Sequence, residues 1–229
     1  MKEKTAVPKP AMQRLCRMYT VLEELKLQGQ EEISSASLSA LLGIPAHTIR
    51  KDISYLGCSP AYLNPPQSAV ALQDTGPSPR TSQGYHITLL LKRIDGALGI
   101  SSPLKTCIVG LGRIGMALLS YQEFIPRGIH IAAGFDKNIN KIELTSSPVP
   151  LYPSYEIEEQ IEALCIDLGV IAVPASSAQQ VADRLIRGGI KGLLNFAPVT
   201  LKCEKPVVIR NIYMVEEFRF LSALIRLQK

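Results

Sequence analysis

Three glycines and one aspartate are the residues of this sequence whose types and spacing could do chemistry. The glycines stand in the run Gly110-Leu-Gly112-Arg-Ile-Gly115, and Asp136 follows 21 residues after the last of them. A glycine turn that opens a helix presents free N–H groups and the positive end of the helix dipole to an anion. An acid about 20 residues farther on accepts hydrogen bonds from ribose hydroxyls. The pattern therefore predicts a dinucleotide with its pyrophosphate against the glycine turn.

Each position in this pattern meets a separate physical requirement. Gly110 permits the tight turn, Gly112 lets main chain approach a pyrophosphate, and Gly115 lets the helix pack on the strand. The carboxylate of Asp136 should repel a 2′-phosphate, so we expect NAD(H) rather than NADP(H). The predicted cofactor-binding residues are Gly110, Leu111, Gly112, Arg113, Ile114, Gly115 and Asp136.

Short apolar segments on either side of the glycines predict the elements that hold them. Residues 105–109 read as a buried strand, residues 116–121 continue a helical pattern, and residues 129–135 form a second apolar run. A bare glycine motif is often a plain turn. Here the strand before it, the helix after it and the closing acid favour dinucleotide binding.

The chain after Asp136 continues to alternate between helices and strands. Its patterns predict helices at 155–164 and 178–187 and strands at 168–173, 192–196 and 207–212. We expect residues 139–149 to form a loop. The alternation predicts an α/β fold with a parallel sheet wound on both faces.

A last helix is predicted at 215–227, where Phe218, Leu221, Leu224 and Ile225 form an apolar face. This helix follows a completed sheet, so its apolar face must find another surface. The length of the helix leaves two surfaces open, a partner subunit or its own domain.

The first 57 residues are organised as three helical segments. Apolar spacing predicts helices at 11–28, around 38–42 and at 47–56. Ser34 or Ser35 can cap the second helix, and Pro45 suits the first turn of the third. Because Gly43 separates two short helices, the segment predicts a helix-turn-helix.

The third of these helices has two different faces. Ile49, Ile53 and Leu56 face one side, and Thr48, Arg50, Lys51 and Ser54 are available to the other. Such a helix fits the major groove of DNA, where arginine and lysine contact phosphates or guanine edges. A small helical docking domain whose cations merely stay in solvent explains the same pattern.

Composition excludes several classes of protein. The net charge is +5, and residues 1–57 hold eight basic against six acidic residues, so charge alone does not indicate nucleic acid. No apolar run approaches the roughly 18 to 20 residues of a membrane span, and no signal-peptide core follows Met1. The five cysteines and three histidines show no ligand spacing. We therefore expect a cytoplasmic chain with no membrane partner, no disulfide framework and no metal site.

Residues 58–83 differ in composition from both flanking regions. Prolines alternate there with serine, glutamine and small residues, which is typical of a linker or extended loop. From residue 85 to about 98 a helix is predicted, with Leu90, Leu91 and Ile94 on its apolar face, and we expect it to join two domains.

Four stretches can be set beside a known family. They are Val7-Pro8-Lys9 with Gln13-Arg14-Leu15 and Tyr19; Thr48 to Gly57; Ile108 to Gly115 with Phe135-Asp136; and Val173-Pro174-Ala175, Ala178-Gln179, Gly189 to Gly192 and Asn195 to Pro198. In these stretches the chain resembles the Rex family of redox-sensing bacterial transcriptional repressors. The resemblance covers nearly everything except residues 58–83.

The resemblance implies an architecture and a function. It implies a winged helix-turn-helix domain at 1–86, with 58–83 as an extended wing or loop, a Rossmann domain at 87–211 that includes the linking helix, and a dimerisation helix at 212–229. In the family this last helix is exchanged between the subunits of a homodimer. NADH closes the dimer and releases operator DNA, while NAD⁺ permits binding. The implied DNA-binding residues are Thr48, Arg50, Lys51, Ser54 and Tyr55, and Arg14 and Tyr121 match positions of the family's redox-sensing contacts.

Three departures from the family pattern bear on this expectation. The family's wing is a short Lys- and Gly-rich hairpin ending in Gly-Tyr, but here 26 residues separate Gly57 from Gly84. The family's aspartate before the C-terminal helix, a partner in its redox-sensing contacts, is replaced by Tyr213. The recognition helix starts with Pro45-Ala46 instead of a polar cap. We expect a divergent member whose response to NADH is weakened or altered.

Two other functions compete with a redox-sensing repressor. A small NAD-dependent oxidoreductase would need an acid or base beside the nicotinamide, and His130 lies inside the second strand, away from its carboxyl end. Lys191 or Tyr121 could take that role, but nothing in the sequence activates either. The second alternative is a DNA-binding regulator that has lost nucleotide sensing, which the tyrosine at position 213 keeps open.

Overall fold

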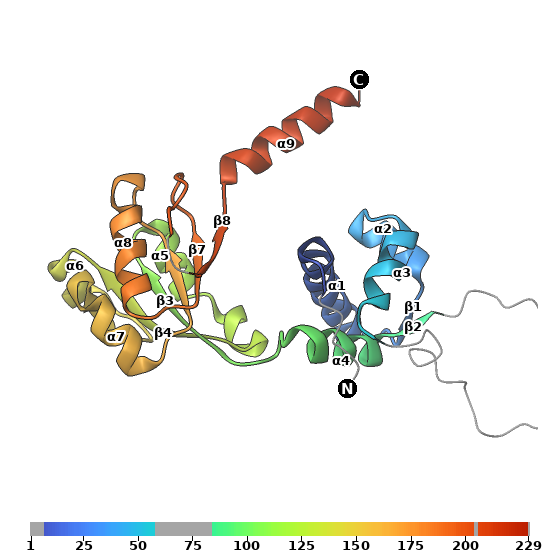
Figure 1. Cartoon of the computed structure of the whole chain (residues 1–229), viewed down its shortest axis with the longest axis horizontal. Coiled ribbons are helices and arrows are strands. Elements are labelled where there is room, and N and C mark those ends of the chain that lie inside the picture. Colours follow the sequence, from blue (N-terminus) through green and yellow to red (C-terminus); the bar gives the residue numbers. More distant parts are fainter. Residues whose placement is uncertain (1–6, 58–83, 204–205, 229) are drawn as a thin grey trace, which may run out of the picture. The chain divides into compact units, whose positions relative to one another are not determined.

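The computed structural model describes residues 7–57, 84–203 and 206–228, and the chain divides between Ser101 and Ser102 into two compact units. Figure 1 shows the elements of both units. Those of the first unit are α1 (Lys9–Leu27), β1 (Glu32–Ile33), α2 (Ser35–Leu42), α3 (Ala46–Ser54), β2 (Tyr85–His86) and α4 (Ile87–Leu98).

The three helices predicted for the first 57 residues are confirmed. Helix α1 buries Leu15, Met18 and Leu22, three positions of its predicted apolar face. Helix α2 begins after Ser34, whose Oγ accepts a hydrogen bond of 3.0 Å from the N–H of Ser37. Helix α3 begins directly after Pro45, so the proline precedes the first turn instead of lying in it. The helix-turn-helix follows from local capping and apolar spacing.

A two-stranded antiparallel sheet in the first unit was not predicted. It pairs Glu32 with His86 and Ile33 with Tyr85. Because each strand is two residues long, neither shows the alternation from which a strand is recognised in a sequence. The expected wing or loop at 58–83 lies outside the described residues.

Helix α4 belongs to the first unit, which corrects the expectation that it forms part of the Rossmann domain. Its buried side chains Ile87, Leu90 and Ile94 share one apolar cluster with Leu15 and Met18 of α1. An amphipathic helix takes its place from the surface that covers its apolar face, and the periodicity of the sequence does not name that surface.

The second unit contains a six-stranded parallel sheet. Its elements are β3 (Leu104–Val109), α5 (Arg113–Leu119), η2 (Gln122–Arg127), β4 (Ile129–Asp136), α6 (Ile139–Leu144), β5 (Leu151–Pro153), η3 (Ser154–Glu156), α7 (Ile157–Leu164), β6 (Leu168–Ile171), α8 (Ala175–Arg187), β7 (Gly192–Asn195), β8 (Val208–Asn211) and α9 (Met214–Leu227). The strand order is β5-β4-β3-β6-β7-β8, with every neighbouring pair parallel. This is the order of a dinucleotide-binding fold, so the predicted doubly wound sheet is confirmed.

Both faces of this sheet are buried. On β3, Cys107 and Val109 lie in one apolar cluster, together with Ile161 of α7 and Leu185 of α8. Ile108 points to the opposite face, in a second cluster that also holds Leu119 of α5. Because both faces are covered, β3 reads as a continuous apolar run.

Several boundaries differ from those predicted. Residues 139–149 were expected to form a loop, but α6 occupies 139–144, with the Oδ1 of Asn138 accepting from the N–H of Lys141 at 3.2 Å. Strand β5 was also missed. Both elements are too short to show a period. Helix α8 begins after Pro174, three residues earlier than predicted, because the segment at its start is polar and carries no apolar signal.

Helix α9 has no buried residue, although its sequence is amphipathic. Phe218 is 70% exposed and Leu221 is 55% exposed. The alternative in which this helix packs on its own domain is therefore wrong for the single chain.

Within the part of the chain that the structure describes, no helix has the length and apolar character needed to cross a membrane.

Candidate functional site

The glycine turn after β3 contains two glycines that the fold requires and one that it leaves free. Gly110 has φ +96°, and a Cβ there would lie 2.6 Å from the carbonyl oxygen of Ala172. A Cβ on Gly115 would strike the carbonyl oxygen of Gly110. A Cβ on Gly112 would meet nothing within 4 Å. Backbone packing thus explains the first and third glycines, and Gly112 borders open space that a ligand could use.

A cavity of about 250 Å³ lies beside this turn. It is placed where the carboxyl ends of β3 and β6 diverge toward opposite halves of the sheet, the position at which open α/β sheets bind ligands. Its lining residues are Val109, Gly110, Gly112, Asp136, Lys137, Lys141, Ser154, Ala172, Val173, Pro174, Ser177, Gln180 and Val181. The lining combines free main chain, hydroxyl groups, one acid and two cations.

Asp136 connects the end of β4 to the glycine turn. Its Oδ2 accepts the N–H of Leu111 at 2.9 Å and the Nζ of Lys141 at 3.2 Å, and its Oδ1 accepts the N–H of Asn138 at 3.0 Å. Burial works to raise the pKa of Asp136, but these hydrogen bonds and the positive charge of Lys141 outweigh it and hold the pKa below its ordinary value. The carboxylate is therefore charged at neutral pH.

The structure brings together some of the predicted cofactor-binding residues. Gly110, Gly112 and Asp136 line the cavity. The side chain of Leu111 is buried in the core, Gly115 packs on the turn, and Arg113 and Ile114 are exposed. Those last four are not among the lining residues.

Sequence reasoning missed several residues of the cavity. Lys137 follows β4, Ser154 follows β5, and Ser177 and Gln180 lie near the start of α8, which follows β6. The carboxyl ends of parallel strands meet at one edge of a sheet, and this rule could have found them. The free main chain at Gly112 and the acid at Asp136 fit a dinucleotide.

Helix α3 presents a polar face to solvent, as predicted. Ile49 and Ile53 are buried, while Arg50, Lys51 and Ser54 are exposed. Thr48 and Tyr55 are half-buried. The Nη1 of Arg50 donates to the Oγ of Ser35 at 3.1 Å, and the Oγ of Ser54 donates to the carbonyl of Lys51 at 2.6 Å. The first of these contacts ties Arg50 to the first residue of α2, while its side chain stays exposed.

A partly buried ion pair joins α3 to α1, and the sequence analysis did not predict it. Asp52 is 1% exposed. Its Oδ2 accepts the Nε of Arg14 at 2.6 Å, and its Oδ1 accepts the Nη2 of Arg14 at 2.7 Å. The bond to Asp52 raises the pKa of Arg14 above its ordinary value. Asp52 follows Ile49 by three residues and therefore lies on the buried face of α3. This position was the signal of the ion pair that the sequence offered.

The predicted redox-coupling residues lie in different units. Arg14 is in the first unit, where Asp52 holds it. Tyr121 is in the second unit, 53% exposed, with its ring 4.9 Å from that of Phe124 in an edge-on arrangement. Tyr213 stands before α9, and its hydroxyl lies 3.3 Å from the Oγ1 of Thr200. Coupling between Arg14 and Tyr121 stays a prediction.

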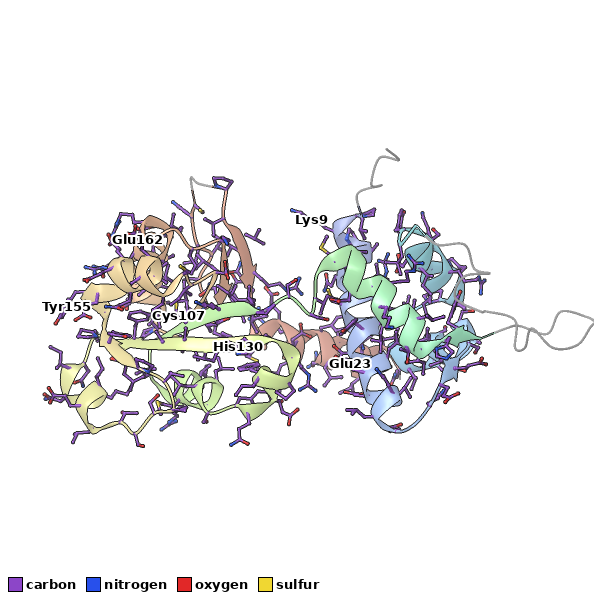
Figure 2. All side chains as sticks on the ribbon, turned by 90° about the horizontal axis from the view of Figure 1, so that it is seen from below. Lys9, Glu23, Cys107, His130, Tyr155 and Glu162 are labelled. Carbon is purple, nitrogen blue, oxygen red and sulfur yellow. The ribbon has the colours of Figure 1, made fainter. Side chains whose placement is uncertain are left out.

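No histidine is among the residues that line the cavity. His130 is the second residue of β4, in register with Lys105 near the start of β3. Figure 2 shows it toward one end of the sheet, while Tyr155, which follows β5, lies toward the other. Among the described residues, no group of histidines, cysteines and acids could hold a metal ion.

Comparisons with known proteins cover both units. Residues 6–54 match the family described as "Putative DNA-binding protein N-terminus", and residues 101–199 match the family described as "CoA binding domain". Redox-sensing transcriptional repressor Rex 1 of Thermotoga maritima is 36% identical over 217 residues, 94% of each chain. The chain belongs to the Rex family of redox-sensing transcriptional repressors. Rex of Limosilactobacillus reuteri is 31% identical over 96% of this chain and 94% of its own.

Solved Rex structures share the whole fold. RSP, a Rex-family repressor, matches with a TM-score of 0.80 and 28% identity over 98% of this chain and 97% of its own. The same repressor has been solved with β-NADH, and with β-NAD⁺ and operator DNA, each with a TM-score of 0.80. Rex proteins are transcriptional repressors rather than enzymes, which answers the oxidoreductase alternative.

Proposed function

We propose that this protein is a DNA-binding transcriptional repressor whose affinity for its operator falls when NADH binds in the cavity beside β3. The cavity carries the proposal. It lies at the point where the strand order of the sheet reverses, and it is bordered by open space at Gly112 and a charged acid at Asp136. The related repressor RSP supports the proposal, since its structures hold NADH or, with operator DNA, NAD⁺.

The cavity would hold NAD(H) largely through main chain. The pyrophosphate would approach the turn from Gly110 to Gly115 on the side left open at Gly112, and the adenosine ribose would lie near Asp136. The second unit, from Ser102 onward, is thus the proposed nucleotide-binding domain.

The first unit is the proposed DNA-reading domain, including α4. Thr48, Arg50, Lys51, Ser54 and Tyr55 are the proposed contact residues of α3. Arg50 and Lys51 are exposed on the face opposite Ile49 and Ile53, so their charges can reach phosphates or base edges when α3 enters a major groove. The proposed action on operator DNA implies a cytoplasmic protein.

The proposed assembly is a homodimer in which the subunits exchange α9. The apolar residues of this helix are exposed in the single chain, and a second copy would bury them. A dimer presents two reading helices to two half-sites, and their spacing sets affinity. If NADH prefers a state with the wrong spacing, a coupling of roughly 1–3 kcal/mol suffices for a useful switch.

A second candidate function is a DNA-binding regulator without nucleotide control. Tyr213 favours it, since the family's aspartate is absent and the tyrosine hydroxyl contacts Thr200 instead. In addition, Arg14 is engaged by Asp52 within its own unit. Under the main proposal, Arg14 and Tyr121 still take part in coupling NADH binding to DNA affinity, without the family's aspartate.

A gel shift on the promoter region of the protein's own gene separates these functions. The full chain is added at a concentration that shifts half of the DNA, and NAD⁺ and NADH are titrated separately. The proposal expects NADH to release the DNA and NAD⁺ to leave it bound. Binding that neither nucleotide affects would establish the second candidate, and absence of any shift in an excess of competitor DNA would contradict both.

A further inference from the structure

Lys141 places a cation within the same cavity as the acid that selects the ribose. Its Nζ lies 3.2 Å from the Oδ2 of Asp136, and its side chain is 35% exposed. Both residues line the cavity. A lysine ammonium has three donors and no acceptor. One donor serves Asp136, so two remain for a ligand.

The backbone of Lys141 is held at two points. Its N–H donates to the Oδ1 of Asn138 at 3.2 Å, and its carbonyl accepts the hydroxyl of Thr145 at 2.6 Å. Helix α6 thus presents the lysine directly after the turn that follows β4. The ammonium is positioned by local structure, and a ligand does not have to gather it from solvent.

Asp136 has little remaining capacity to accept hydrogen bonds. A carboxylate offers about four lone-pair positions. Three are taken by the N–H groups of Leu111 and Asn138 and by the Nζ of Lys141. Asp136 alone can therefore accept from about one of the two ribose hydroxyls, and the other hydroxyl needs a different partner.

We infer that Lys141 is a second ribose-binding residue and that it determines how strongly the cavity distinguishes NADH from NADPH. Its ammonium donates to a ribose hydroxyl oxygen of NAD(H), and with NADP(H) it would pair with the 2′-phosphate. This inference rests on the proposed nucleotide site. Under this inference, the charge of Asp136 would not by itself exclude NADP(H).

Electrostatics support this assignment. The three charged residues of the lining are Asp136, Lys137 and Lys141, so the charge at this end of the cavity is not negative. An acid repels a 2′-phosphate much less when a cation lies beside it. Replacing Lys141 removes an attraction to the 2′-phosphate and also leaves the charge of Asp136 without its cation. Both changes weaken the binding of NADPH. The ribose of NADH loses the hydrogen bond from Lys141, but the lone pair of Asp136 that accepted from Lys141 becomes available to it.

Dissociation constants for NADH and NADPH test the inference in the full chain. Lys141→Met should raise the preference for NADH over NADPH by roughly tenfold, mainly through weaker NADPH binding. Lys141→Arg keeps the charge and should stay within about twofold of the wild-type ratio. Lys105→Met is the matched control, because it removes a lysine from the same unit at the amino end of β3, and its ratio should not change. Thermal melting confirms that each variant is folded.

A fourth variant separates two effects of Lys141, its direct contact with the 2′-phosphate and its neutralisation of the charge of Asp136. In an Asp136→Asn background, Lys141→Met should still weaken NADPH binding, because the lost phosphate contact does not depend on the carboxylate. If NADPH affinity is unchanged in that background, direct contact is wrong.

The inference as a whole is overturned if Lys141→Met binds NADH like wild type and keeps the wild-type ratio. Wild-type protein that binds neither nucleotide would instead overturn the proposed function, and the inference with it.

Discussion

Each unit sets an aspartate beside a cation, and the two pairs differ in what surrounds them. Asp52 is 1% exposed and takes a bidentate contact from Arg14. Asp136 is 9% exposed, shares its contacts with two backbone N–H groups, and borders a cavity of about 250 Å³ with Lys141. The first pair is closed, because Asp52 is buried and both of its carboxylate oxygens accept from Arg14. The second leaves donors of the lysine free.

The difference shows two ways of building a site. In the first unit the ion pair joins the inner face of α3 to α1, and the proposed DNA-contact residues are on the outer, convex face. In the second unit the proposed nucleotide-contact groups are main chain and side chains from several strand ends around a cavity. A convex site depends on one helix, whereas a concave site depends on the alignment of many elements. Substitutions should therefore separate structural from ligand-binding roles differently in the two units.

Filling the space beside Gly112 should have the largest effect, because it tests the proposed nucleotide site of the second unit directly. A Cβ there meets no atom within 4 Å, so Gly112→Val should fold normally while its side chain blocks the pyrophosphate. We expect NADH affinity to fall roughly a thousandfold, about 4 kcal/mol, by calorimetry. Gly115→Ala is the contrasting variant, because its Cβ strikes the Gly110 carbonyl and should lower the melting temperature. Normal NADH binding by Gly112→Val would remove the turn from the site.

Breaking the ion pair between Arg14 and Asp52 tests whether the main role of Arg14 is to stabilise the fold. Arg14→Ala leaves the carboxylate of Asp52 buried without its cation, and this should cost about 3 kcal/mol of unfolding free energy, near the lower end for buried pairs because the arginine side chain is 32% exposed. Urea unfolding measures the change. Tyr121→Phe, which removes the hydroxyl of the other predicted coupling residue, should leave stability within about 0.5 kcal/mol. An Arg14→Ala protein as stable as wild type would show that the pair does not hold α3.

Removing one outward cation of α3 sharpens the distinction between its two faces. Arg50→Ala should weaken operator binding by roughly tenfold in a fluorescence anisotropy titration, because one phosphate or base contact is lost. Lys26→Ala removes an exposed cation near the end of α1 and serves as the control. Equal losses in both variants would indicate a general charge effect, and no loss in Arg50→Ala would exclude α3 from the interface.

The pair of Asp136 and Lys141 should also give the smallest of these effects, a dependence of stability on pH. The pKa of Asp136 is lowered in the folded protein, so its contribution to stability is full above the unfolded value of about 3.9 and is lost as the pH falls through the folded pKa. Melting temperatures between pH 7 and pH 3 should therefore fall less steeply for Asp136→Ala than for wild type. The same variant should show a reduced preference for NADH over NADPH by a few-fold. An unchanged preference would contradict the ribose role of Asp136.

The sequence predicted the parts of this molecule that depend on local rules. Apolar runs on either side of the glycines from Gly110 to Gly115 indicated a strand before them and a helix after them, and the alternation that follows indicated a parallel sheet. The apolar faces of α1 and α3 were readable for the same reason, since each repeats every three or four residues. Each of these elements shows its pattern within a short run of consecutive residues.

What the sequence did not show depends on contacts between distant segments. Asp52 and Arg14 are 38 residues apart, and the position of Asp52 on the buried face of α3 does not identify its partner. Lys141 belongs to a helix of six residues that was taken for a loop, so its place beside Asp136 could not be foreseen. Likewise, periodicity gave α4 an apolar face but did not say that α1 covers it. Tertiary packing decides such pairs.

The central claim is that a nucleotide in the cavity beside Gly112 controls the affinity of α3 for operator DNA. The direct measurement is fluorescence anisotropy of a labelled operator bound by the full chain, with NADH titrated into wild type and into Gly112→Val. The account predicts that NADH releases the DNA from wild type and leaves the Gly112→Val complex intact. Wild-type protein that stays bound at saturating NADH, or a Gly112→Val complex released at the same NADH concentration as wild type, would contradict it.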